Sequence, residues 1–144
     1  MACDSPKVKN DTATEAENIS TDWFLDTQPD WMSTELAYTT GIAFLDVDRD
    51  GDMDLIVSEG NDMEPGLLRL YENNGGDLET TASWSSEDPQ YYGHLAVGDL
   101  NGDDWPDVAV SRFLGENRFE SPGGVEVFLN SNGGFHSLPD WEDS

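Results

Sequence analysis

The sequence is poor in basic residues. Its 144 residues contain 6 lysines and arginines against 31 aspartates and glutamates, which gives a formal net charge of -25. A surface with this charge repels phosphate backbones and anionic lipids, so nucleic acid and anionic membranes are excluded as partners. A large excess of acids with so few lysines also fits a habitat of high salt.

Cysteine, long apolar runs and helical periodicity are scarce as well. The single cysteine, Cys3, provides no disulfide framework, and no apolar stretch is long enough for a membrane span or a signal core. Hydrophobic residues make up 36% of the chain, which also has 14 glycines, a composition that suits short strands and turns. We therefore expect an all-β protein.

One segment of the sequence occurs twice. Residues 41–58 return as residues 94–111, and in both copies aspartates at alternate positions separate two apolar runs. Apolar runs bounded by an aspartate-rich turn predict a strand, a loop and a second strand.

The repeat period can be read from matching residues. Asp46 and Asp99 lie 53 residues apart, whereas Asn73 and Asn130 lie 57 apart, so the second copy has gained four residues within 113–123. A period of this size with four short strands per unit is typical of propeller blades.

The order of these elements resembles the FG-GAP/VCBS repeat of integrin-α-type β-propellers. The resemblance rests on the apolar strand, the aspartate-rich loop, the second apolar strand, the Gly-Gly-Val-Glu-Val-Phe-Leu-Asn run of residues 123–130 and the Asn-Gly-Gly-Phe run of residues 132–135. It covers roughly residues 38–141. It implies that each aspartate-rich loop joins the two inner strands of a blade and binds calcium.

The chemistry of the loops predicts calcium independently of the resemblance. Calcium takes six to eight oxygens, and alternate residues of a tight loop turn their carboxylates toward one centre. In the first loop we expect the side chains of Asp46, Asp48, Asp50 and Asp54 together with the carbonyl of Asp52. In the second loop we expect the side chains of Asp99, Asn101, Asp103 and Asp107 together with the carbonyl of Trp105. The sequence thus predicts about two calcium ions.

The alternative is that these aspartates only form turns, but two clusters of like charge would repel strongly without a cation. An EF-hand is excluded because Val57 and Val110 stand where its glutamate is required. The second loop has one carboxylate fewer, and Asp104 replaces Gly51 at a position that favours a left-handed backbone. We therefore expect the second site to be weaker.

The chain divides into four expected parts. Residues 1–20 form an acidic flexible arm, residues 21–37 an orphan strand with its connection, residues 38–84 the first blade and residues 85–144 the second. The expected fold is all-β, with two four-stranded antiparallel β-propeller-type blades. Ala2 and Cys3 before the polar arm resemble a processed lipoprotein end, so Cys3 is a possible lipid anchor, with a free thiol as the alternative.

Catalysis is not expected. Ser58 and Ser111 occupy equivalent strand ends, which favours an architectural role, and no histidine-rich open metal site is present. Trp31, Trp84 and Trp141 recur with the repeat, so we expect them to pack between blades. Aromatic candidates for carbohydrate contact are Tyr91, Tyr92 and Trp105.

The sequence therefore predicts a calcium-stabilised binding module on the cell surface or outside the cell. Two blades leave open faces and sheet edges, so we expect the chain to bind itself, as a ring or filament, or to mediate surface adhesion. Another surface protein or a carbohydrate is a further candidate partner. The alternative is a non-catalytic propeller fragment of a larger secreted polysaccharide-active enzyme or adhesin.

Overall fold

The computed structural model describes residues 28–115 and 117–143. The chain divides into two units at residues 30 and 31, and of the first unit only residues 28–30 are described. The predicted flexible arm, Cys3 and residues 21–27 of the predicted orphan-strand segment lie outside the described residues. Residues 28–38 form no strand.

All regular elements of the described residues are strands. In chain order they are β1 (Thr39–Leu45), β2 (Asp54–Gly60), β3 (Pro65–Tyr71), β4 (Asn73–Asn74), β5 (Asp77–Leu78), β6 (Trp84–Ser85), β7 (Tyr92–Gly98), β8 (Asp107–Arg112), β9 (Leu114–Gly115), β10 (Arg118–Pro122), β11 (Val125–Phe128) and β12 (Trp141–Glu142). Within the described residues, no helix is long and apolar enough to cross a membrane.

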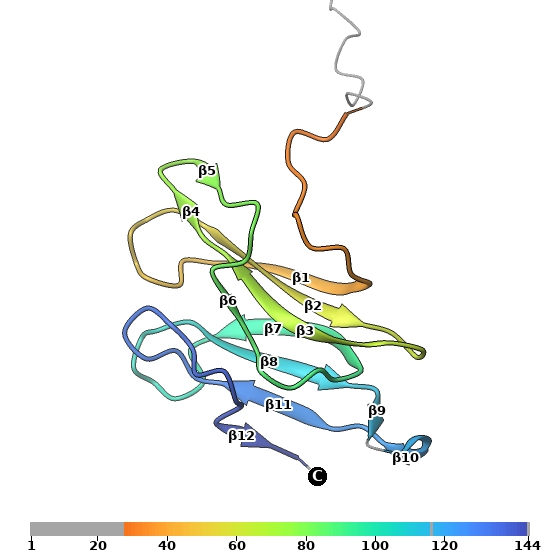
Figure 1. Cartoon of the computed structure of the whole chain (residues 1–144). Coiled ribbons are helices and arrows are strands. Elements are labelled where there is room, and N and C mark those ends of the chain that lie inside the picture. The colour runs from red at the N-terminus through yellow and green to blue at the C-terminus, as the bar shows by residue number, and fades with distance from the viewer. Residues whose placement is uncertain (1–27, 116, 144) are drawn as a thin grey trace, which may run out of the picture. The chain divides into compact units, whose positions relative to one another are not determined.

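The strands build two four-stranded antiparallel sheets of the same topology. Their orders are β1-β2-β3-β6 and β7-β8-β11-β12, each a meander in which neighbours in sequence are neighbours in space (Figure 1). The residues gained by the second copy form the β9–β10 hairpin. No sheet closes into a barrel within the described part of the chain. The predicted all-β fold of propeller-like blades is confirmed.

The two sheets pack face to face over one apolar core. Side chains alternate between the faces of a strand, so Ile56 of β2 points toward the second sheet while its neighbours Leu55 and Val57 point away from it. From the second sheet, Val108 and Val110 enter the shared core. The larger core is therefore the interface between the blades, and a second, smaller cluster of Leu55, Val57 and Tyr71 lies on the other face of the first sheet.

Gly41 lets the inner strands of the two blades approach each other closely. A Cβ on Gly41 would lie 3.2 Å from the carbonyl oxygen of Gly93 and 3.3 Å from the Cα of His94. Beside them, the buried hydroxyl of Ser58 donates to the Gly93 carbonyl at 2.6 Å. The equivalent hydroxyl of Ser111 donates to the His94 carbonyl at 3.1 Å. Both predicted architectural serines thus bond strand backbones.

A tryptophan covers the end of each sheet at the same repeat position. Trp84 packs edge-on against Phe128 with ring centroids 5.8 Å apart, and Trp31 packs in the same way against Tyr71 at 5.3 Å. Trp141, the third member of the series, is 54% exposed. Trp84 therefore packs between the blades as predicted, whereas Trp31 packs on the outer cluster of the first blade alone.

Residues 31–35 dock on the first sheet, and the link after β6 docks on the second sheet in the same way. The Thr34 N–H donates to the Thr80 carbonyl at 2.7 Å, and the Glu87 N–H donates to the Ser137 carbonyl at 2.8 Å. Both donors lie three residues beyond a tryptophan of the series, so the two contacts are equivalent.

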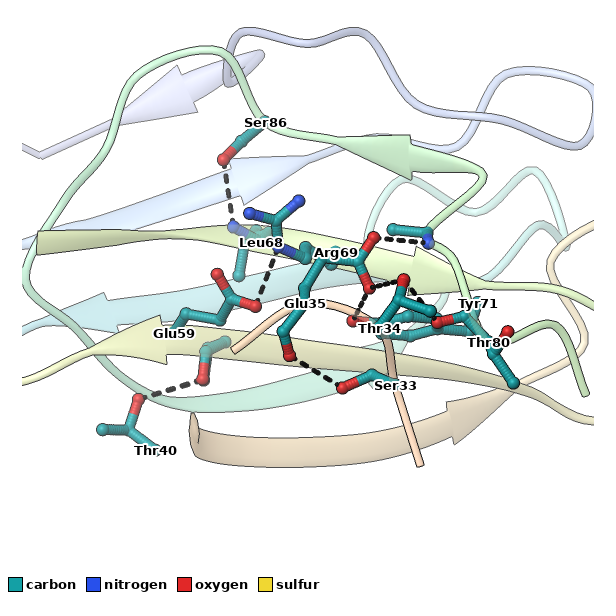
Figure 2. A network of polar contacts seen from close by, with 12 residues as sticks. Ser33, Thr34, Glu35, Thr40, Glu59, Leu68, Arg69, Tyr71, Thr80 and Ser86 are labelled. Carbon is teal, nitrogen blue, oxygen red and sulfur yellow. Dashed lines mark hydrogen bonds and ion pairs between the residues drawn. The ribbon is translucent and has the colours of Figure 1, made fainter. Parts of the chain in front are cut away.

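Each sheet also holds a buried ion pair between its second and third strands. In the first blade Arg69 Nε lies 2.8 Å from Glu59 Oε1 (Figure 2). In the second blade an Arg112 guanidinium nitrogen lies 3.3 Å from Glu126 Oε1. The positions match, but the charges are exchanged between the strands. Burial raises the pKa of Glu126.

We predict that Trp84→Ala destabilises the protein by about 3 kcal/mol, because it removes a ring that packs against the core and leaves a cavity there. Trp141→Ala is the matched control, and it should change stability by less than about 0.5 kcal/mol since its ring is largely in solvent. Urea unfolding of both variants measures the difference. Equal losses would show that Trp84 is not a packing anchor.

Candidate metal centre

The first acidic loop connects β1 to β2 and is folded by its own carboxylates. Backbone N–H groups of later residues donate to earlier side chains: Asp50 N to Asp48 at 3.1 Å and Gly51 N to Asp46 at 3.2 Å. Such short-range bonds are the reason Asp is favoured in turns. They bend the chain so that alternate side chains face one centre.

Asp46, Asp48 and Asp50 form the candidate site. One carboxylate oxygen from each lies within 4.8 Å of the others, a spacing from which three oxygens can hold a metal ion. In addition, Asp46 Oδ1 is buried without a hydrogen-bond partner. An anionic oxygen without a partner is costly unless a cation satisfies it. The donor set of oxygens alone suits calcium.

The remaining two residues predicted for the first site lie differently. The Asp52 carboxylate turns away and accepts from Gly75 N at 3.0 Å, which leaves its backbone as the only predicted donor. The Asp54 carboxylate is buried beneath the loop, where it accepts from Val47 N at 2.8 Å and Asn73 N at 2.9 Å. The structure thus gathers three of the five predicted residues.

The second loop, between β7 and β8, repeats this hydrogen-bond pattern. The Asp99 carboxylate accepts from Gly102 N at 2.7 Å and Asp104 N at 3.0 Å, and the bond from Gly102 holds the pKa of Asp99 below its ordinary value. Trp105 N donates to Asp103 at 2.9 Å, and the Asn101 side chain donates to the same carboxylate at 2.9 Å.

The last predicted ligand of the second loop, Asp107, is buried like its counterpart Asp54. Its carboxylate accepts from Leu100 N at 2.8 Å and Asn130 N at 2.9 Å. The second loop therefore has the same scaffold as the first, but with an amide in place of one carboxylate. No equivalent buried oxygen without a partner occurs on it among the described residues.

Both loops need a left-handed backbone at two positions. Gly51 has φ 98° and its counterpart Asp104 has φ 68°, as the sequence predicted. The sequence reasoning missed the other position, where Arg49 has φ 63° and Gly102 has φ 83°. Each loop therefore has one glycine and one strained residue, and backbone strain does not make the second loop the weaker one. The ranking of the sites rests on charge alone.

Residues of the two loops line one shallow depression of the surface. Asp46 and Arg49 line it from the first loop, and Asp99 and Asp104 line it from the second. The Arg49 guanidinium lies 4.1 Å from the centroid of the Trp105 ring, a cation–π contact that links the loops. Arg49 thus places a positive charge between two acidic loops.

One prediction for carbohydrate contact is wrong. Tyr92 is 1% exposed, and its hydroxyl donates to Glu126 at 2.7 Å, so it cannot stack on a sugar. Trp105 lies beneath Arg49. Tyr91 lies 5.6 Å from the Arg118 guanidinium. No cluster of free aromatic rings is left at this place among the described residues.

We predict that Asp50→Ala abolishes the tighter of two calcium affinities, whereas Asp103→Ala abolishes the weaker one. The first loop has more carboxylates, and one of their oxygens lacks a hydrogen-bond partner. We therefore expect it to be the tighter site, which the loss of the Asp50 carboxylate removes. Isothermal titration calorimetry of the two variants and the parent measures both sites. Loss of the tighter affinity in Asp103→Ala would reverse the ranking.

Comparison with known families agrees with this geometry. Residues 46–110, which include both loops and the strands between them, match the model of the FG-GAP-like repeat. No curated protein matches the chain at a significant level. The matched region begins at the first residue of the first loop and ends in β8, the strand after the second loop, so the family model spans both duplicated loops. Residues 46–110 are thus similar to the FG-GAP-like repeat, which is consistent with an FG-GAP-type repeat protein.

Proposed function

We propose that this protein is a calcium-stabilised extracellular binding module that associates with further copies of itself through its open blade faces. It works by binding and not by catalysis. FG-GAP repeats are the units of β-propeller-type binding modules, and the match of residues 46–110 to this repeat supports a binding role. The observation that carries it is an apolar face on the first blade whose counterpart on the second blade is covered.

Two large side chains of β1 make up this open face. Ile42 is 63% exposed and Phe44 is 59% exposed. Their repeat counterparts, Leu95 and Val97, are partly buried and pack against the shared core. In the second blade these positions pack between the two blades, whereas in the first blade they are exposed to solvent. Exposed apolar faces of this kind mark sites of association.

A second copy of the chain is the occupant that fits this open face best. The face of the second blade that points away from the first blade has smaller side chains at the positions where the open face has larger ones. Ala109 and Gly98 stand at the positions of Ile56 and Leu45. Phe44 in turn replaces the smaller Val97. Head-to-tail contact would place the added volume of one face against the reduced volume of the other.

One residue prevents the copies from repeating the internal interface in full. His94 occupies the position of Gly41, where a Cβ would lie 3.2 Å from a carbonyl oxygen of the next blade. Copies docked in this way would be held slightly apart at the inner strands. The contact between copies should therefore be weaker than the contact between the blades of one chain.

Calcium would stabilise the blades before they associate. The three carboxylates of the first loop carry like charges within 4.8 Å, and one of their oxygens lacks a partner. A divalent cation offsets this repulsion and fixes the loop. Calcium is abundant outside cells, which fits both a weak structural site and the extracellular location of many FG-GAP repeats.

We predict that millimolar calcium raises the melting temperature by roughly 10 °C over chelator, because a ligand at 100 times its dissociation constant contributes about 2.7 kcal/mol per site. Differential scanning calorimetry in the two buffers, with magnesium as the control ion, measures the shift. Identical melting curves would overturn the calcium part of the proposal.

We predict that Phe44→Asp converts associated protein into monomer in calcium, because it places a charge on the open face. Phe119→Asp is the matched control: Phe119 is 72% exposed but lies on the β9–β10 hairpin, away from this face. His94→Gly should strengthen association by removing the spacer. Analytical ultracentrifugation with and without calcium measures all three.

A parent protein that stays monomeric at high concentration in calcium would overturn self-association. The open face would then belong to a missing blade, and the alternative function would take its place: a non-catalytic propeller fragment of a larger secreted polysaccharide-active enzyme or adhesin. Adhesion to another surface protein or a carbohydrate would be detected as binding by the monomer.

A further inference from the structure

A buried asparagine connects the two acidic loops. Asn130, at the turn after β11, is 1% exposed. Its side-chain nitrogen donates to the carbonyl of Val47 in the first loop at 2.8 Å. Its side-chain oxygen accepts from Gly133 N at 3.0 Å and Gly134 N at 2.9 Å, so the amide is held in one orientation. A residue of the second blade thus fixes the backbone of the first loop.

The same asparagine is held by the second loop. Its backbone N–H donates to Asp107, the last acidic residue of that loop, at 2.9 Å. At the other end, Val47 stands between Asp46 and Asp48, two of the three carboxylates that face one centre. A continuous path of hydrogen bonds therefore runs from the second loop through Asn130 to the first.

The equivalent asparagine of the first blade makes no such link. Asn73 N donates to Asp54, just as Asn130 N donates to Asp107. The Asn73 side chain, however, donates to Met53 of its own loop at 3.1 Å. The chain therefore contains a natural control: one asparagine joins two loops, and its counterpart stays within one.

Two further contacts lie along the same boundary. The Arg49 guanidinium rests on Trp105 at 4.1 Å, which ties a left-handed residue of the first loop to the second loop. A Cβ on Gly133 would lie 3.3 Å from the Cβ of Asp48, so the turn that Asn130 organises also touches the first loop. The first loop is thus supported by the second blade at three points.

We propose that the two loops bind calcium cooperatively and that Asn130 is the positioning residue that couples them. The inference rests on the proposed calcium binding. A cation on the second loop holds the chain around Asp107, and Asn130 transmits that order to Val47 and the carboxylates beside it. The first loop then loses less conformational freedom when its own cation binds.

The opposite sign is expected if charge alone connects the loops. They line one shallow surface depression, and a divalent cation on one loop weakens the negative potential that attracts the second cation. Charge alone therefore predicts that an empty second loop makes the first loop bind more tightly. Ordering through Asn130 predicts that an empty second loop makes it bind more weakly.

Calcium titration by calorimetry on the full chain tests the proposal. Asp50→Asn weakens the first loop, the tighter one, with little change of shape, and by the reciprocity of coupling it should lower the affinity of the second loop by about fivefold or more. In an Asn130→Ala background the same substitution should change that affinity by less than about twofold. In an Asn73→Ala background the full effect should remain, although the first loop itself binds more weakly.

Salt and a second readout separate the outcomes. Raising the potassium chloride concentration screens the antagonism between charges, so the coupling should grow. Hydrogen exchange of the Val47 amide should slow when the second loop is filled, and this readout decides the matter if Asn130→Ala does not fold. Two independent affinities, or a second loop tightened by Asp50→Asn, would overturn the coupling alone. Absence of any calcium binding would overturn the proposed function with it.

Discussion

Each blade depends on one buried aspartate at the end of its acidic loop. Asp54 and Asp107 are 2% and 0% exposed, and each uses both carboxylate oxygens to accept backbone N–H groups from two distant points of its blade. Burying a carboxylate is costly unless it is hydrogen-bonded, and burial still raises the pKa of Asp54. The residue nevertheless joins the start of the loop, the start of the second strand and the turn after the third. The exposed aspartates of the loop are therefore held in place by the buried carboxylate of this aspartate.

The two blades agree where contacts are local and differ where they are not. Most of their loop hydrogen bonds correspond, but the ion pair runs from Glu59 to Arg69 in one and from Arg112 to Glu126 in the other. A hybrid sheet that paired β2 with β11 would place Glu59 beside Glu126 in the interior. Like charges buried side by side are strongly unfavourable. Because the glutamate and the arginine exchange strands between the blades, the second strand of each blade pairs favourably only with the third strand of the same blade. This disfavours mispairing between two repeats of otherwise similar sequence.

The sequence was sufficient for features that short segments determine. Alternating aspartates predict the loops, β-branched and aromatic runs predict the strands, and the glycine at position 51 marks a backbone that Asp104 shares. Features that depend on contacts between the two blades could not be predicted from the sequence. Asn73 and Asn130 occupy equivalent positions, so the sequence assigns them one role, and only the distance between the sheets decides which carbonyl each amide reaches. Gly102 was a signal for the left-handed position of Arg49, but it is visible only when glycines are compared across the two copies.

The burial of Tyr92 was missed for a related reason. Two adjacent tyrosines give no indication of which faces the core, because neighbouring residues of a strand point to opposite faces. The choice is made by Glu126, whose buried carboxylate accepts from the Tyr92 hydroxyl. A polar partner of this kind lies 34 residues away in sequence. Long-range polar contacts of the interior are therefore the part of this fold that pattern alone does not predict.

The net charge of -25 sets a limit on what calcium can do for this protein. Two divalent ions would cancel only four of these charges, so they cannot neutralise the surface as a whole, and their effect must be local to the loops. Association of copies has to overcome the repulsion of the remaining acids, which salt screens over about 8 Å at physiological ionic strength. The apolar side chains of the open face act only at contact, whereas this repulsion acts at a distance. Self-association should therefore depend on two separate conditions: calcium to order the blades, and enough salt for their faces to meet.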